Sequence, residues 1–90
     1  MKEIVKSAVA GTMESSDVYV EIEPAKEGLE IELESVVFHQ FGESIRQVVL
    51  EVLKECGVEK AHVRVSDRGA LECVIRARVE TAVLRGKEEA

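Results

Sequence analysis

A change in the spacing of apolar residues near position 35 constrains the fold of this chain most strongly. Within residues 18–23 and 29–34, apolar and polar residues alternate, as in strands with one buried and one solvent-exposed face. From residue 38 onward, apolar residues recur at steps of three and four, which is typical of a helix with one broad apolar face. A chain with both patterns is expected to pack helices against a sheet. The apolar residues at helical steps are Phe38, Phe41, Ile45, Val48, Val49, Val52, Leu53 and Cys56.

Alternation of this kind predicts five strands. The last strand is the least regular, because Val74 interrupts the alternation, but a helix there would scatter the charged residues around its surface. Asp67-Arg68-Gly69 precedes it and is predicted to be a hairpin turn, since Gly69 can adopt positive φ. Glu30, Glu32 and Glu34 fall on the polar side of the third strand and are interpreted as its solvated face rather than as a ligand cluster. The five strands are expected over residues 8–13, 18–23, 29–34, 61–66 and 71–79.

The long helix, expected over residues 38–56, has a candidate cap at each end. Ser35 is the candidate N-cap, and Gly57 stands where a C-terminal glycine with positive φ belongs. Gly42 lies inside the helix, where glycine lowers the stability of a helix by about 1 kcal/mol relative to alanine. A glycine at this position therefore indicates either a close backbone approach or a slight bend. The predicted fold is therefore one α+β domain over residues 1–90. It is a two-layer sandwich of a mostly antiparallel sheet of about five strands, one long helix, and a short C-terminal helix over residues 80–85.

Composition excludes several classes of partner. The formal net charge is −6, and the chain has two Phe, one Tyr and no Trp. Binding to nucleic acid depends on neutralising phosphates with basic residues and, for single strands, on aromatic faces for stacking. We therefore expect no nucleic acid and no anionic membrane as partners. With no apolar run of signal-peptide or membrane-spanning length, the chain is expected to be cytoplasmic.

The cysteines and histidines of this sequence do not have the spacing of a catalytic or metal-binding motif. Cys56 and Cys73 both lie in apolar surroundings and are interpreted as reduced, structural thiols, and no pairing of cysteine or histidine has the spacing of a metal site. His39 and His62 have no nucleophile partner at a motif spacing and are interpreted as surface residues. We therefore predict a chain that is not an enzyme and has no metal site.

The stretch between the first two strands carries two adjacent hydroxyls. Ser15 and Ser16 lie between Glu14 and Asp17, where small polar residues between two strands mark a reversal of the chain. Serine and aspartate commonly occupy turns for local hydrogen bonding alone. No histidine or lysine nearby in the sequence could activate either serine as a nucleophile. If one of these serines has a chemical role, it is as a point of attachment.

Three stretches resemble the acyl carrier (gamma) subunit of citrate lyase. The first is Ala8-Val9-Ala10-Gly11-Thr12-Met13-Glu14-Ser15-Ser16-Asp17-Val18, which is similar to the family's N-terminal motif. Gln40-Phe41-Gly42-Glu43-Ser44-Ile45-Arg46 resembles its helix segment. Asp67-Arg68-Gly69-Ala70-Leu71-Glu72-Cys73-Val74-Ile75-Arg76-Ala77-Arg78 resembles its C-terminal motif. The three occur in the family's order over nearly the whole chain. Ordinary acyl carrier proteins, which use an Asp-Ser-Leu motif on a helix bundle, do not match.

The resemblance implies a carrier that holds an acyl group on a covalent arm. In the family, 2'-(5''-phosphoribosyl)-3'-dephospho-CoA is joined by a phosphodiester to a serine, and that position is Ser15 here. Ser16 occupies a position where the family has glycine. The implied partners are the alpha subunit (acyl transferase), the beta subunit (lyase), the enzyme that transfers the arm, and the ligase that acetylates it. In that complex, the acetyl thioester is exchanged for a citryl thioester, which is cleaved to oxaloacetate and the acetyl carrier.

Two further readings of the sequence stay open. The carrier subunit of malonate decarboxylase uses the same kind of arm, and a small regulatory or assembly domain would also fit an α+β pattern.

The role of three arginines is open as well. The three are Arg46, Arg76 and Arg78. Either they lie near the serine loop and bind the arm's phosphates or acidic groups of the partner subunits, or they offset the glutamates on the solvated face of the sheet.

Overall fold

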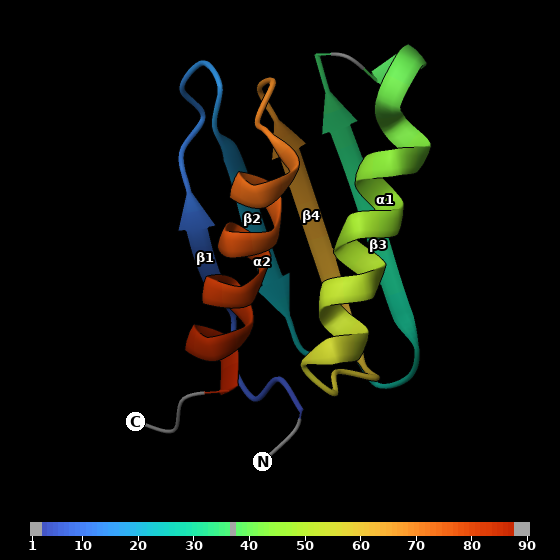
Figure 1. Ribbon diagram of the computed structural model, residues 1–90. Coiled ribbons are helices and arrows are strands. Elements are labelled where there is room, and N and C mark those ends of the chain that lie inside the picture. The colour runs from blue at the N-terminus through green and yellow to red at the C-terminus, as the bar shows by residue number, and fades with distance from the viewer. Residues whose placement is uncertain (1–2, 37, 88–90) are drawn as a thin grey trace.

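The computed structural model describes residues 3–36 and 38–87, without the side chains of residues 38–42. Within this part of the chain, four strands and two helices follow one another in the order β1, β2, β3, α1, β4, α2 (Figure 1). Neither helix is long and apolar enough to cross a membrane. The elements are β1 (Ala8–Gly11), β2 (Val18–Glu23), β3 (Leu29–Ser35), α1 (Phe38–Glu55), β4 (Ala61–Asp67) and α2 (Glu72–Lys87). The predictions for Phe38, His39, Phe41 and Gly42 lie outside the described side chains.

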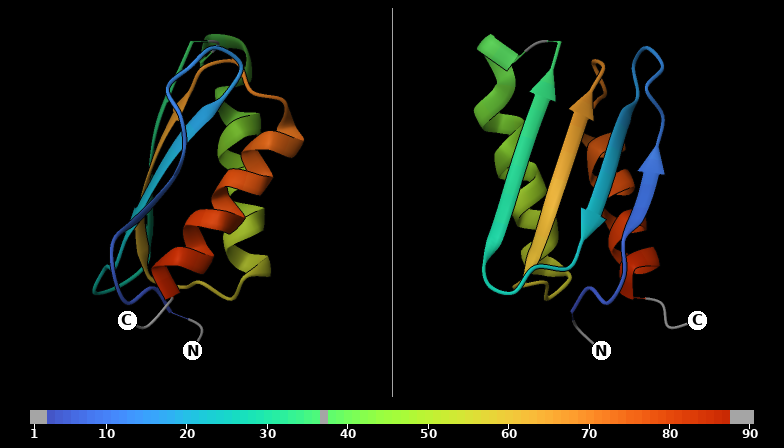
Figure 2. Two further views of the ribbon diagram at one scale, coloured as in Figure 1. Left: turned by 90° about the vertical axis from the view of Figure 1, so that its left-hand side faces the viewer. Right: turned by 180° about the vertical axis from the view of Figure 1, so that it is seen from behind.

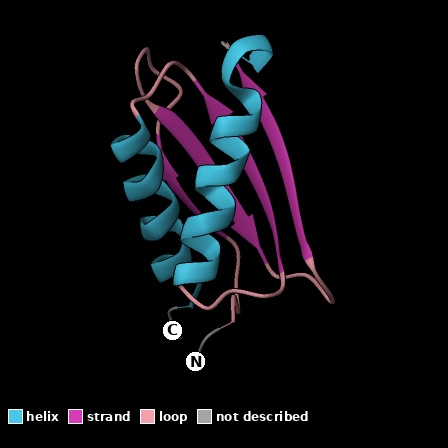
Figure 3. Cartoon of the chain, turned by 45° about the vertical axis from the view of Figure 1, so that its right-hand side comes forward, coloured by secondary structure: helices cyan, strands magenta, loops and turns pink. Residues whose placement is uncertain are grey.

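The four strands form a mixed sheet in the order β1-β2-β4-β3. The pairs β1–β2 and β2–β4 are antiparallel, whereas β3 and β4 are parallel and are joined through α1. Both helices lie on one face of the sheet, and the opposite face is not covered by either of them (Figures 2 and 3). The predicted two-layer α+β sandwich is confirmed.

The hydrophobic core lies between the sheet and the two helices. Alternate residues of β2 and β4 are buried, because successive side chains of a strand point to opposite faces. On α1 the buried residues recur at the predicted helical steps. Leu29, Ile31 and Leu33 of the edge strand β3 are half-buried against this core. The fully buried side chains of the sheet and of α1 include Val18, Val20, Ile22, Val49, Val52, Leu53, Val63 and Val65.

The prediction of about five, mostly antiparallel strands is wrong in number and in part in direction. The chain passes from β3 to β4 through α1, and such a crossover brings the second strand back parallel to the first. The predicted fifth strand over residues 71–79 is instead the first half of helix α2, and the predicted helix over residues 80–85 is part of its second half. The sheet therefore ends at β1 and β3.

The pattern of burial explains why residues 71–79 form a helix. The buried residues of α2 are four, three, one and three positions apart, which is the spacing of a helix face. Leu71 and Cys73, which alternation would bury, are exposed, and Leu71 retains 71% of its accessible surface. The alternation of charge in this segment was a coincidence of sequence. The buried residues are Ile75, Val79, Ala82, Val83 and Gly86.

The C-terminal end of α1 confirms the predicted cap. Gly57 has a φ of 76°. Its N–H donates to the carbonyl of Lys54 (3.0 Å), and the N–H of Val58 donates to the carbonyl of Leu53 (2.9 Å). These two bonds form a Schellman motif, in which a glycine with positive φ lets the chain leave the helix while the last carbonyls stay bonded.

One prediction about the other connections is wrong. Ser35, the candidate N-cap of α1, is the last residue of β3, and its Oγ donates to Oδ2 of the buried Asp67 at 2.8 Å; its role as a cap depends on residues that lie outside the described part of the chain. The segment from Asp67 to Gly69 is no hairpin turn, because it leads from β4 into α2. Asp67 Oδ1 accepts the N–H of Ala70 at 3.0 Å, and Gly69 adopts the expected positive φ, at 93°. A buried carboxylate thus joins the ends of β3 and β4 to the start of α2.

Candidate functional site

The loop between β1 and β2 ends in a tight turn with Ser15 at its tip. The N–H of Asp17 donates to the carbonyl of Glu14 at 3.1 Å, so Ser15 and Ser16 are the central residues of a β-turn. Ser16 has a φ of 67°, and positive φ at the second central position is the mark of a type II turn. Both serines are exposed. The turn lies at the end of the molecule opposite the described ends of the chain (Figure 1).

A β-bulge connects this turn to the residue that follows β4. The N–H of Ser16 donates to the carbonyl of Arg68 at 2.8 Å, and the N–H of Arg68 donates to the carbonyl of Asp17 at 2.9 Å. Two residues of one segment therefore face one residue of the other, and the first of the two has positive φ. This is the G1 type of bulge, which normally places glycine where Ser16 stands. The bulge fixes the turn directly beside Arg68.

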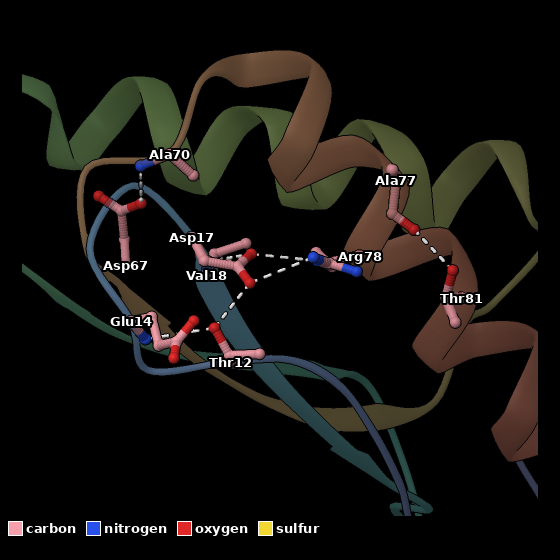
Figure 4. Close-up of polar contacts among 9 residues, drawn as sticks. All are labelled: Thr12, Glu14, Asp17, Val18, Asp67, Ala70, Ala77, Arg78 and Thr81. Atoms are coloured by element: carbon pink, nitrogen blue, oxygen red, sulfur yellow. Dashed lines mark hydrogen bonds and ion pairs between the residues drawn. The ribbon is translucent and has the colours of Figure 1, made fainter.

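The carboxylate of Asp17 holds the base of the loop (Figure 4). Its Oδ1 accepts the N–H of Val18 (2.7 Å) and the Nε–H of Arg78 (3.1 Å). Its Oδ2 accepts the Thr12 hydroxyl (2.7 Å) and an Nη2–H of Arg78 (3.1 Å). The hydrogen bonds from Thr12, Arg78 and Val18 favour the charged form, and they lower the pKa of Asp17 to about 2. A residue of α2 is thereby bonded to the loop that presents Ser15.

Gly11 allows the two sides of the loop to approach each other. It has a φ of 87°, and a Cβ at this position would lie 1.8 Å from the carbonyl oxygen of Val18. No side chain other than hydrogen fits at that distance. Beyond it, the Thr12 oxygen accepts the N–H of Glu14 at 3.2 Å. The loop is therefore fixed at its base, while the serine pair projects from it.

Of the three arginines named from the sequence, only Arg78 lies at this loop. Arg46 donates from Nη1 to the carbonyl of Ile31 in β3 at 2.9 Å. Arg76 pairs with Glu55 (2.7 Å) and Glu51 (3.4 Å) of α1, and these carboxylates raise its pKa. The first of the two open alternatives, that they lie beside the serines, is thus wrong for Arg46 and Arg76. The alternative, that they offset the glutamates on the polar face of the sheet, is wrong as well for Arg76 and Arg78, since their carboxylate partners lie on α1 and in the loop.

Comparison with known proteins places the chain in a family. A family model described as the malonate decarboxylase delta subunit (MdcD), an acyl carrier protein, matches residues 5–86. The citrate lyase acyl carrier protein of Escherichia fergusonii is 57% identical over 88 residues, covering 97% of this chain and 91% of that protein. The chain belongs to the citrate lyase acyl carrier protein family. The corresponding protein of Klebsiella pneumoniae is 54% identical over 83 residues, covering 91% of this chain and 86% of that protein.

Solved structures agree with this assignment at the level of the fold. A chain of a Pseudomonas malonate decarboxylase hetero-tetramer, crystallised in complex with malonate, superposes with a TM-score of 0.75 at 27% identity. The match covers 89% of this chain and 82% of that chain. A Thermus thermophilus protein, at 16% identity and a TM-score of 0.59, matches 92% of this chain but only 16% of its own length, and shows the fold alone. A chain of a malonate decarboxylase complex thus shares this fold.

Three residues of types that can bind a metal ion lie on the open face of the sheet, away from the serine turn. The ligand atoms of Glu30, Glu32 and His62 all lie within 4.8 Å of one another. His62 contacts Glu32 through Nε2 and Glu23 through Nδ1, the latter at 3.1 Å. Arg64 adds its own charge, with its Nε 3.6 Å from Glu32. Glu32 and Glu23 thus already have Arg64 as a cationic partner. The exposed glutamates confirm the predicted solvated face of β3.

The two cysteines are free thiols in different surroundings. Cys56 is half-buried at the end of α1, and burial raises the pKa of its thiol. Cys73 is exposed on the first turn of α2, so the expectation of a structural, apolar environment is wrong for this residue. That expectation for Cys73 was derived from the strand predicted over residues 71–79.

An apolar cavity of about 370 Å³ lies beside the connection from β4 to α2 in this acyl carrier family member. Its walls come from α1, from the connection after β4 and from the start of α2, and Asp67 is one of the residues that line it. None of residues 12–17 lines this cavity, so the cavity is separate from the serine turn. The apolar lining residues are Ile45, Val48, Ala70, Leu71 and Ile75.

Proposed function

We propose that this chain is the acyl carrier subunit of citrate lyase and that Ser15 is the point of attachment of its prosthetic arm. The single observation that carries the proposal is an exposed serine at the tip of a turn whose base is fixed on both sides. An anchor of this kind gives a modifying enzyme access to the hydroxyl. It also leaves the swinging motion to the arm, while the folded body stays rigid.

The arm proposed at Ser15 is 2'-(5''-phosphoribosyl)-3'-dephospho-CoA, joined through a phosphodiester. When bound, it supplies a terminal thiol that carries the acyl group as a thioester. The exposed hydroxyl of Ser15 fits such a linkage, because a phosphodiester needs only an accessible oxygen and room for a charged group. Tethering keeps the thioester at a high effective concentration near the active sites of partner subunits.

The geometry of the turn favours Ser15 over Ser16 as the modified residue. Ser16 holds the position of positive φ in the bulge, and its N–H is bonded to Arg68. That position suits a residue without a side chain, in agreement with the glycine implied there by the family resemblance. A position that glycine can fill does not depend on a hydroxyl. Ser15, at the first central position of the turn, therefore provides the hydroxyl for attachment.

The proposed partners follow from the same function. They are the alpha subunit, which transfers acyl groups, and the beta subunit, which cleaves the citryl group. Two further proteins would act on the carrier alone: the enzyme that attaches the arm to Ser15, and the ligase that acetylates its thiol. A chain with a net charge of −6 is suited to partners with basic surfaces.

The malonate decarboxylase carrier is the nearest rival. The family model carries that description, and a malonate decarboxylase chain shares the fold at 27% identity. The much higher identity of 57% to a citrate lyase carrier favours the citrate lyase assignment. A small regulatory or assembly domain is a rival of another class, and such a domain would not need Ser15.

Reconstitution with partner subunits separates these readings. The arm-bearing, acetylated chain is mixed with citrate lyase alpha and beta subunits, and release of oxaloacetate from citrate is measured. We expect release with the wild type and with Ser16→Ala, and none with Ser15→Ala. Activity with malonate decarboxylase subunits but not with citrate lyase subunits would support the rival carrier. Assembly and full activity of Ser15→Ala would support the regulatory domain.

A further inference from the structure

Arg68 is an arginine beside the serine turn whose charge has no partner in the described part of the chain. Its Nε is completely buried and has no hydrogen-bond partner there. Its side chain is half-buried and forms no ion pair with any described carboxylate. A buried donor without an acceptor is unusual in folded proteins and calls for an explanation, such as an ion or ligand that completes it. In the sequence this residue was part of a predicted hairpin and of the third stretch that resembles the citrate lyase carrier.

The other arginines near the ends of the elements are already bonded. Arg78 makes two hydrogen bonds to Asp17, Arg76 pairs with Glu55, and Arg85 donates to the carbonyl of Val9. Arg64 on the open face has carboxylates within 4.0 Å. Arg68 therefore differs from them in being free to bind an added anion.

We propose that Arg68 binds the phosphate that links the prosthetic arm to Ser15. This inference rests on the proposed attachment of the arm. The bulge fixes the position of Arg68: its backbone is hydrogen-bonded on one side to Ser16 and on the other to Asp17. The attachment hydroxyl belongs to the residue directly before this pair, within reach of an arginine side chain.

The charges around the turn support a phosphate as the ligand. The Asp17 carboxylate is already neutralised by Arg78, so it does not compete for Arg68. A phosphodiester brings a negative charge and unbonded oxygens to Ser15. Guanidinium donors match phosphate oxygens in geometry, and hydrogen bonds between two charged groups are roughly twice as strong as those between neutral groups. Attachment of the arm would thus bring an anion to the guanidinium of Arg68, which forms no ion pair in the described part of the chain.

This role predicts opposite effects of one substitution before and after attachment of the arm. In the apo protein, Arg68→Met removes an unbonded buried donor and retains most of the packing, so the thermal midpoint Tm is expected to stay or rise. In the wild type, attachment of the arm is expected to raise Tm by about 4–8 °C. Arg68→Met is expected to lose this increase, and Arg68→Lys to keep part of it. Arg64→Met, on the open face, is the matched control and should keep all of it.

The experiment uses the full chain, co-expressed with and without the arm-transferring enzyme. Intact mass first establishes which samples carry the arm, and Tm and the phosphorus NMR signal of the Ser15 diester are then compared. We expect the diester signal to shift between wild type and Arg68→Met and to stay unchanged in Arg64→Met. A wild type that gains no arm would overturn the proposed function and this inference together. Arm attachment with equal Tm increases and equal diester signals in all variants would overturn only the role of Arg68, as would a lower Tm of the apo Arg68→Met protein.

Discussion

The guanidinium of Arg78 and the carboxylate of Asp17 meet through two hydrogen bonds of 3.1 Å each. Arg78 lies on α2 and Asp17 ends the serine turn, so the pair connects the helix layer to the loop that presents Ser15. Thr12, on the other side of the loop, bonds to the same carboxylate. Asp17 is therefore the residue at which the helix and both sides of the loop are joined.

Removal of this connection should loosen the loop without unfolding the protein. In Arg78→Met, Asp17 keeps its bonds to Thr12 and Val18 but loses two charge-assisted donors. We expect faster amide hydrogen exchange in residues 12–17 and a lower Tm, with little change in the exchange of β4. Exchange measured by NMR or mass spectrometry tests this. Unchanged exchange in the loop would show that Arg78 does not hold it.

The low pKa of Asp17 predicts a loss of stability in acid. Its pKa is about 2 in the folded protein and 3.8 for an unperturbed aspartate, so the unfolded chain takes up the proton first. The contribution of Asp17 is therefore complete above about pH 4 and is lost as the pH falls toward 2. The free energy of unfolding, measured between pH 2 and pH 5, should fall less steeply in Asp17→Asn than in the wild type. Parallel pH profiles of the two proteins would contradict the low pKa.

The positive φ of Ser16 predicts a stabilising substitution. Residues with a side chain pay about 1–2 kcal/mol in the left-handed region, and glycine does not, although glycine also makes the unfolded chain more flexible. We expect Ser16→Gly to raise the free energy of unfolding by about 0.5–1 kcal/mol. Ser15→Gly is the control, since Ser15 has no positive φ, and it should bring no gain. Equal effects of the two substitutions would argue against a strained Ser16.

Alanine substitutions at two glycines with similar φ distinguish the cost of backbone strain from the cost of a steric clash. Gly11 and Gly28 have φ values of 87° and 72°. An added Cβ would meet the Val18 carbonyl oxygen at 1.8 Å at Gly11, but no atom within 4 Å at Gly28. Gly11→Ala should therefore cost about 3 kcal/mol or more, and Gly28→Ala about 1–2 kcal/mol. Urea denaturation gives both values, and equal losses would show that the two sides of the serine loop are not in contact.

Much of the fold could be predicted because its signals are local. Strict alternation located β2 and most of β3 and β4, and helical spacing located α1 with its cap at Gly57. The β-turn with exposed Ser15 was also predictable, because small polar residues between two strands mark a reversal. Attachment at Ser15 itself stays a prediction.

The errors arose where the decisive contacts are distant in sequence. Helix α2 buries Ile75 and Val79 against the sheet, and that packing overrides the alternation of its charges. The position of Arg68 beside the serine turn depends on a bulge with Ser16 and Asp17, some fifty residues away in sequence. The bond between Arg78 and Asp17 spans 61 positions. No local pattern distinguishes these arginines from Arg46 or Arg76.

Attachment of the arm to Ser15 is tested most directly by the intact mass of the chain after co-expression with the arm-transferring enzyme, followed by peptide mapping. We expect the wild type and Ser16→Ala to gain the mass of one arm, on the peptide that contains Ser15, and Ser15→Ala to gain nothing. A full mass gain in Ser15→Ala, or an unmodified wild type, would contradict this attachment.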